Sequence, residues 1–102
     1  MNQLAITKRI AQIENLDYSV EGGDCCVVVN RSGLRLKEIY NPFDDAVNHR
    51  LVVKYGVVVD IVDTVDDKFY PEIDGCQWGE PVFYDDYNLA VLSIIIKKYA
   101  IK

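Results

Sequence analysis

One stretch decides the fold: NPFDDAVNHRLVVKYGVVVD, residues 41–60. It contains, without a gap, the start, the body and the end of a helix, and then a strand. Pro42 is well suited to the first turn of a helix, where Asp44 and Asp45 can accept hydrogen bonds from free backbone N–H groups and complement the helix dipole. Gly56 stands where helices commonly end in a left-handed residue. The sequence therefore predicts a helix that starts just after Pro42 and ends at Gly56.

Apolar residues recur at every fourth position of this helix. Val47, Leu51 and Tyr55 form one stripe, which we expect to face a sheet, whereas polar residues such as Asn48 lie largely off it. The run VVVDIV, residues 57–62, follows immediately and is too continuous and too β-branched for a solvent-facing hairpin strand. It predicts a central strand.

The sequence before this stretch predicts a helix and an antiparallel meander. Asn2 can cap a helix that extends to about Asn15, with Ile6, Ile10 and Ile13 on one face. Alternating and β-branched residues then mark three short strands separated by turns, at residues 18–20, 25–29 and 34–37.

The sequence after it predicts a strand at residues 68–73, which Pro71 favours at a sheet edge. Residues 82–84 fit either a last short edge strand or an extended lead-in to the final helix. That helix is expected to begin near Asp85 or Asp86, and it is apolar almost all round, which predicts burial against a sheet and another element or subunit. The expected fold class is α+β: a mainly antiparallel sheet of four to six strands with three helices, in two or three layers.

Length and composition favour one compact domain over residues 1–102. Half of the 102 residues are hydrophobic and 26% are charged, which is enough apolar surface to fold without a metal or a disulfide. Cys25, Cys26 and Cys76 are an odd and badly spaced set for a disulfide framework, so we expect reduced thiols. No leader opens the sequence, and its longest nearly apolar run, residues 89–96, is too short to span a bilayer. We therefore expect a soluble protein of the cytoplasm with no membrane partner.

The charge pattern argues against nucleic acid as a partner. The formal net charge is −5, and most of the 11 basic residues are scattered, so no stripe that could follow a phosphate backbone is visible. A DNA mimic would need a denser acidic face than 16 carboxylates offset by 11 cations provide.

The order of parts also carries a resemblance. Asn41-Pro42, then acidic Asp45, an amphipathic helix, a Gly stop and an apolar strand resembles the core pattern of small tailed-phage proteins of the NinX-like and phage alpha-beta-alpha sandwich types. Those proteins also tend to open with a short helix and close with a strongly apolar one, similar to residues 2–15 and 87–102. The families have no settled biochemical activity, so the resemblance implies a fold and a phage origin only, with the host bacterial cytoplasm as the location.

Catalytic and metal-binding signatures are weak. His49 could be a general base or a phosphate contact, but no nucleophile stands at a motif spacing to it, and a surface histidine without a role is favoured. With Cys25, Cys26 and Cys76 it would make four zinc ligands in number, yet none of the usual paired spacings is present. We therefore expect no enzyme, no cofactor and no structural metal. Whether the acidic turn at residues 60–67 binds a cation is left open.

The most suggestive feature is a set of aromatic residues interleaved with acidic ones in the loop-rich last third of the chain. Tyrosine and tryptophan next to turns are typical of protein-binding surfaces, because they bury a large area at a small cost in side-chain entropy. An equally weighted interpretation is that half of them close the end of a small core. The candidate protein-binding residues are Phe69, Tyr70, Trp78, Phe83, Tyr84 and Tyr87.

These observations lead to two hypotheses for function. The first is a small phage-encoded accessory protein, not an enzyme, that binds a host or phage protein through this aromatic and acidic surface. The second is a small-ligand module, for instance nucleotide-binding, with a pocket between protomers. Because the last helix is so apolar, we also expect a homodimer, with Trp78, Tyr84 and Tyr87 near the shared surface and Leu92 deeper in the core.

Overall fold

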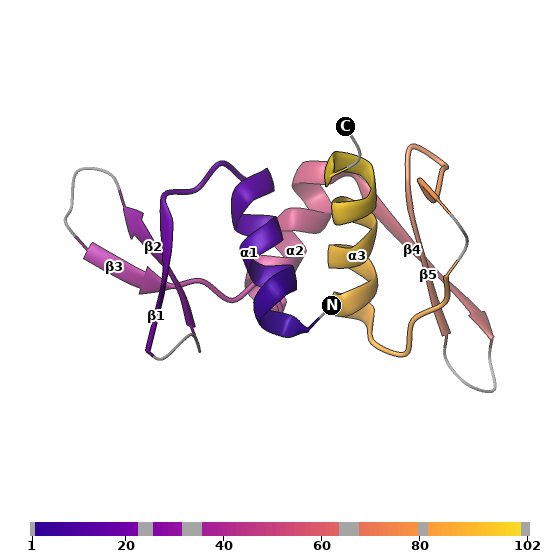
Figure 1. The fold of residues 1–102 in the computed structure, drawn as a ribbon. Coiled ribbons are helices and arrows are strands. Elements are labelled where there is room, and N and C mark those ends of the chain that lie inside the picture. The colour runs from indigo at the N-terminus through magenta and orange to yellow at the C-terminus, as the bar shows by residue number, and fades with distance from the viewer. Residues whose placement is uncertain (1, 23–25, 32–35, 64–67, 80–81, 101–102) are drawn as a thin grey trace. The chain divides into compact units, whose positions relative to one another are not determined.

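A computed structural model provides the structure and describes residues 2–22, 26–31, 36–63, 68–79 and 82–100. The fold class is α+β, as predicted: within the described residues there are three helices and two antiparallel sheets, one of three strands and one of two (Figure 1). The chain divides into two compact units, Met1–Asn41 and Pro42–Lys102. A single domain over the whole chain stays a prediction, and each unit is described by itself.

The first unit is a helix followed by a meander. In α1, Gln3–Ile13, the N-cap is Asn2, whose side chain accepts a 2.8 Å hydrogen bond from the N–H of Ala5. Ile6 and Ile10 are buried, as their spacing predicts. The strands are β1, Tyr18–Glu21, β2, Cys26–Arg31, and β3, Leu36–Ile39; they pair in sequence order, and α1 packs against β2.

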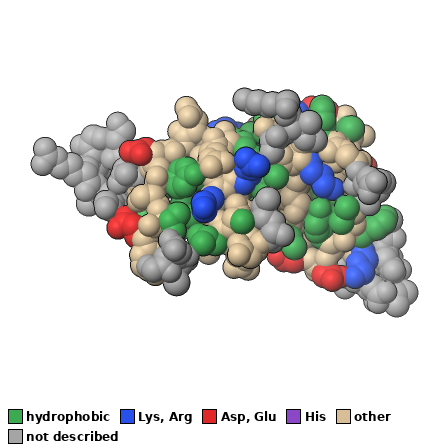
Figure 2. Space-filling model, in the orientation of Figure 1, with side chains coloured by type: hydrophobic (Ala, Val, Ile, Leu, Met, Phe, Trp, Pro, Cys, Tyr) green, Lys and Arg blue, Asp and Glu red, His purple; other side chains and the backbone are tan. Residues whose placement is uncertain are grey.

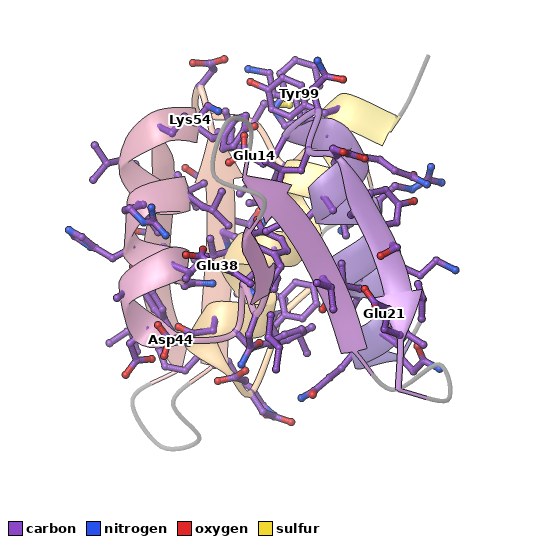
Figure 3. The ribbon with its side chains drawn as sticks, turned by 90° about the vertical axis from the view of Figure 1, so that its left-hand side faces the viewer. Glu14, Glu21, Glu38, Asp44, Lys54 and Tyr99 are labelled. Carbon is purple, nitrogen blue, oxygen red and sulfur yellow. The ribbon has the colours of Figure 1, made fainter. Side chains whose placement is uncertain are left out.

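The second unit begins with the helix that the central stretch predicts. In α2, Asp45–Tyr55, the side chain of Asp44 accepts hydrogen bonds from the N–H groups of Ala46 and Val47. Gly56 ends the helix in the left-handed conformation at φ 65°, and its N–H donates to the carbonyl of Val52. Figure 3 shows Asp44 at one end of α2 and Lys54 near the other. Both helix boundaries are therefore set by local chemistry that can be read from the sequence.

A two-stranded sheet and the last helix complete this unit. The strands β4, Val57–Asp63, and β5, Lys68–Ile73, are antiparallel, with Val57 opposite Ile73 and Asp60 opposite Tyr70. The helix α3, Tyr87–Ala100, packs against β5, α2 and β4. Its start matches the prediction, because the carboxylate of Asp86 accepts from the N–H of Leu89 at 3.2 Å. In the described part of the chain, no helix is long and apolar enough to cross a membrane.

The predicted central position of residues 57–62 is wrong. Within the described residues β4 pairs only with β5, so it is an edge strand, and the side chains of Val58 and Ile61 are 55% and 61% exposed. The five strands form two sheets in place of the single sheet of four to six strands that we expected. Each sheet pairs strands that are consecutive in the chain, and the boundary between the two compact units falls between β3 and β4.

The environment of Asn48 also differs from the prediction. It was expected to lie off the buried stripe of α2, but it is 1% exposed. Its side-chain amide donates to the carbonyl oxygens of Pro42, at 3.1 Å, and Asn88, at 3.2 Å. The amide nitrogen of this buried side chain makes its hydrogen bonds inside the protein, whereas its Oδ1 has no hydrogen-bond partner among the described residues.

Candidate functional site

The register of β5 decides where the candidate aromatic residues lie. Phe69 and Tyr70 are successive residues of a strand, so their side chains project from opposite faces of the sheet. Beyond β5, Phe69 and Tyr84 form an antiparallel bridge with N–H to carbonyl hydrogen bonds of 2.8 and 2.9 Å. Residues directly opposite each other share a face. Tyr84 therefore lies on the face of Phe69, and Phe83 lies on the face of Tyr70.

The face of Phe69 is turned toward α3. The rings of Phe69 and Tyr87, the first residue of α3, meet edge to face, with centroids 5.8 Å apart. The ammonium of Lys97 lies 5.9 Å from the centroid of the Tyr84 ring. Such contacts hold the aromatic rings against the helix, so Phe69 and Tyr84, both half-buried, serve the packing of this unit.

The opposite side of the sheet, which we call the outer face, consists of Val58, Asp60, Tyr70, Glu72 and Phe83. On β4 and β5, Val58 pairs with Glu72 and Asp60 pairs with Tyr70, so each cross-strand pair combines an apolar or aromatic residue with an acidic one. The rings of Tyr70 and Phe83 lie against each other, with centroids 5.1 Å apart and planes at 33°. Phe83 is 51% exposed.

Figure 2 shows one side of the molecule, on which hydrophobic side chains gather at the surface over β4 and β5. Acidic and basic side chains lie beside this gathering. An apolar patch with charged neighbours is the composition expected of a binding surface.

Trp78 lies apart from the outer face, at the other end of β5. It belongs to a turn in which Asp74, Gly75, Trp78 and Gly79 all have positive φ. Its indole N–H donates a 3.0 Å hydrogen bond to the carbonyl of Ile73, and the Lys98 ammonium lies 5.3 Å from its ring centroid. These contacts fix the indole beside the C-terminal part of α3.

Lys98 links the same turn to α3 by charge. Its ammonium donates to the Asp74 carboxylate at 2.9 Å, and this hydrogen bond is the main reason that the pKa of Lys98 is raised above 10.5. The neighbouring Tyr99 ring packs against that of Tyr55 with centroids 5.0 Å apart, and Figure 3 shows Tyr99 at the Lys54 end of α2. The C-terminal turn of α3 is therefore held by ion-pair and ring contacts.

The other candidate residues are not gathered into a site. His49 is exposed on α2, and Cys76 is exposed in the turn after β5, where its sulfur accepts from the N–H of Trp78 at 3.4 Å. Cys25 and most of the acidic turn, residues 64–67, lie outside the described residues. Among those that the structure does describe, no three His, Cys, Asp or Glu side chains are grouped so that they could hold a metal ion.

The six aromatic residues thus separate into three groups: Phe69, Tyr84 and Tyr87 toward α3, Tyr70 and Phe83 on the outer face, and Trp78 in the turn. Sequence reasoning missed Val58 as a surface residue, because a β-branched residue within an apolar run reads as buried. A half-exposed strand usually alternates between apolar and polar residues, but this signal is missing here because the neighbours Val57 and Val59 are apolar too.

The apolar residues of α3 do not form an exposed surface for a second copy. Leu92 is fully buried, as the dimer hypothesis required, but Val91, Ile94 and Ile95 are also at most 1% exposed in a single chain. The apolar circumference of α3 is therefore no argument for a second copy. The homodimer stays a prediction, which light scattering checks: a mass of twice 11.6 kDa would support it.

Comparison with known proteins gives no match to this chain, whether with protein-family models, curated proteins or solved structures.

Proposed function

We propose that this protein binds another protein through the outer face, and that it does so as a non-enzymatic accessory protein of a tailed phage in the cytoplasm of its bacterial host. The phage setting rests on the resemblance of residues 41–60 to small tailed-phage proteins. The binding role rests on one observation, the ring pair of Tyr70 and Phe83 on a surface rather than in a core.

This pair has the properties of a binding anchor. A ring that already lies against a neighbour has little freedom left to lose when a partner covers it, so more of the burial energy remains as affinity. Val58 extends the apolar area across β4, and the carboxylates of Asp60 and Glu72 provide polar surroundings that can select a partner by charge.

Affinity capture from a lysate of the bacterial host tests the proposal. The wild-type protein and the variant Phe83→Ser are immobilised at equal density, and the captured proteins are compared by mass spectrometry. The matched control is Val53→Ser, which removes an apolar side chain that is 69% exposed on α2, away from the outer face. We expect one or more partners to be retained by the wild type and the control and lost by Phe83→Ser.

Two results would contradict this function. One is capture of the same proteins by all three baits. The other is a thermal-shift response to a nucleotide panel, because a small ligand at a hundred times its dissociation constant adds roughly 2.7 kcal/mol to the native state. That second result would favour the small-ligand alternative.

A further inference from the structure

The backbone of β4 has one edge without a partner strand. In an antiparallel strand both backbone groups of a residue point to the same side, and the side alternates from residue to residue. Phe69 uses its N–H and carbonyl on Tyr84, so within β5 it is Tyr70 and Glu72 that bond to β4. The backbone N–H and carbonyl groups of their partners Asp60 and Val58 therefore point toward β5. Those of Val57, Val59 and Ile61 point away from β5.

The corresponding edge of β5 is closed. Pro71 has no N–H to offer there, and the Gln77 side chain reaches its carbonyl oxygen at 3.5 Å. Phe69 bonds to Tyr84, and Ile73 exchanges two 3.0 Å hydrogen bonds with Cys76. Every described position that faces this edge, from Phe69 to Ile73, is thus blocked or occupied.

The edge of β4 lacks these features. Residues 57–61 include no proline and no lysine, which are the residues that commonly protect edge strands. Apart from β5, no described segment pairs with Val59 or Ile61. A register shift between Ile61 and Asp63 ends the regular part of the edge, so it has room for a short strand of about five residues.

The charges beside this edge select the kind of strand that it can take. Residues 42–102 contain eleven Asp and Glu against six Lys and Arg, whereas residues 1–41 contain five of each, so the whole net charge of −5 belongs to the second unit. Lys68 and Lys98 form ion pairs with Asp85 and Asp74. Asp60, which is exposed next to the open edge, has no ion-pair partner among the described residues.

We propose that the edge of β4 receives an extended, basic segment of the partner protein as an added antiparallel strand. In that register, the guest residue opposite Asp60 is Lys or Arg, the one opposite Val58 is apolar, and both project over the outer face beside Tyr70. The inference rests on the proposed function and names its mode of binding. A second copy of this chain fits less well, because β4 contains no Lys or Arg that could stand opposite Asp60.

A synthetic peptide tests this pairing directly. The probe is acetyl-STVKVITS-amide. When the valine that follows lysine stands opposite Val59, the lysine stands opposite Asp60. The matched control, acetyl-STVEVITS-amide, replaces lysine by glutamate. We expect calorimetry to show that the lysine peptide binds the wild type roughly tenfold more tightly than the glutamate peptide, and that Asp60→Lys reverses this order. In hydrogen exchange, the lysine peptide should slow the amides of Val59 and Ile61.

A backbone variant adds a second readout. Val59→Pro removes an N–H that points away from β5, so it should leave the β4–β5 pairing intact, as the native Pro71 opposite it does, and abolish peptide binding. If this variant does not fold, the charge reversal at Asp60 decides by itself. Equal affinity for both peptides, or binding without slowed exchange at Val59 and Ile61, would overturn strand addition.

The same variants separate this inference from the proposed function. Partner capture that is lost with Phe83→Ser but unchanged with Asp60→Lys and Val59→Pro would leave protein binding through the outer face in place and rule out the strand-addition mode. Capture that none of the three variants changes would exclude both.

Discussion

Asn48 and Asn88, forty residues apart, join the starts of α2 and α3 through their side chains. The Asn48 amide donates to the carbonyl of Asn88, and the Asn88 amide donates to the carbonyl of Phe43 at 2.7 Å and to the Asp45 carboxylate at 2.9 Å. Asn48 on α2 therefore donates to a carbonyl in the first turn of α3, and Asn88 on α3 donates to a carbonyl just before α2.

Replacing Asn48 by alanine should destabilise the protein by about 2–3 kcal/mol, because it leaves the carbonyls of Pro42 and Asn88 without their donor. Urea denaturation measures the loss. The adjacent His49→Ala is the control: His49 is exposed, so its removal should change the free energy of unfolding by less than about 0.5 kcal/mol. Equal losses in both variants would show that the buried amide is not what matters.

Gly56→Val should cost about 1–2 kcal/mol of stability, since a β-branched residue is strained at φ 65°. Apart from Gly56 itself and its two neighbours in the chain, no heavy atom lies within 4 Å of the place where a Cβ would stand, so the cost is one of backbone conformation and not of space. Gly56→Asn should consequently cost less, because asparagine tolerates the left-handed conformation better. Identical denaturation midpoints for wild type and Gly56→Val would mean that α2 ends differently.

The ion pair of Lys98 and Asp74 predicts a stability difference at alkaline pH. The pKa of Lys98 is raised in the folded protein, chiefly by its hydrogen bond to Asp74, so the pair contributes its full stabilisation below 10.5 and loses it as the pH rises through the folded pKa. Compared with Lys98→Met, which keeps the aliphatic stem, the wild type should be more stable at neutral pH and lose this advantage above 10.5. Urea midpoints of both proteins across this range measure it. An advantage that grows with alkalinity would contradict the assignment.

We expect neither a chelator nor a reductant to change the melting temperature. The apolar surface of the chain is sufficient for folding, and the sequence contains no paired ligand spacing or disulfide framework. Calorimetric melting with and without EDTA, and separately with and without a thiol reductant, checks this. A decrease of about ten degrees on chelation would point to a metal that sequence reasoning overlooked.

The features that the sequence predicted well are local. Asp44, Gly56 and Asp86 act on backbone groups within four residues, so the ends of α2 and the start of α3 could be located from residue type and spacing. β1, β2 and β3 pair in the order in which they follow in the chain, and the close spacing of the predicted strands is also a local signal.

The features that it missed depend on partners distant in the chain. The burial of Asn48 requires a carbonyl at Asn88, which helical periodicity cannot reveal. The exposure of Val58 depends on whether another element covers the outer face of the sheet, and an apolar run does not show this. The division of the aromatic set follows from the bridge between Phe69 and Tyr84, because shifting that register by one residue would exchange the faces of Phe83 and Tyr84.

The indole of Trp78, fixed between the Ile73 carbonyl and the Lys98 ammonium, is the chain's single tryptophan and belongs to the second unit. Its fluorescence emission therefore acts as a built-in optical reporter of that unit, whereas far-ultraviolet circular dichroism records the backbone of both. If the two signals trace superimposable curves during denaturation, the chain melts as one cooperative body, and if they separate, its two units melt independently.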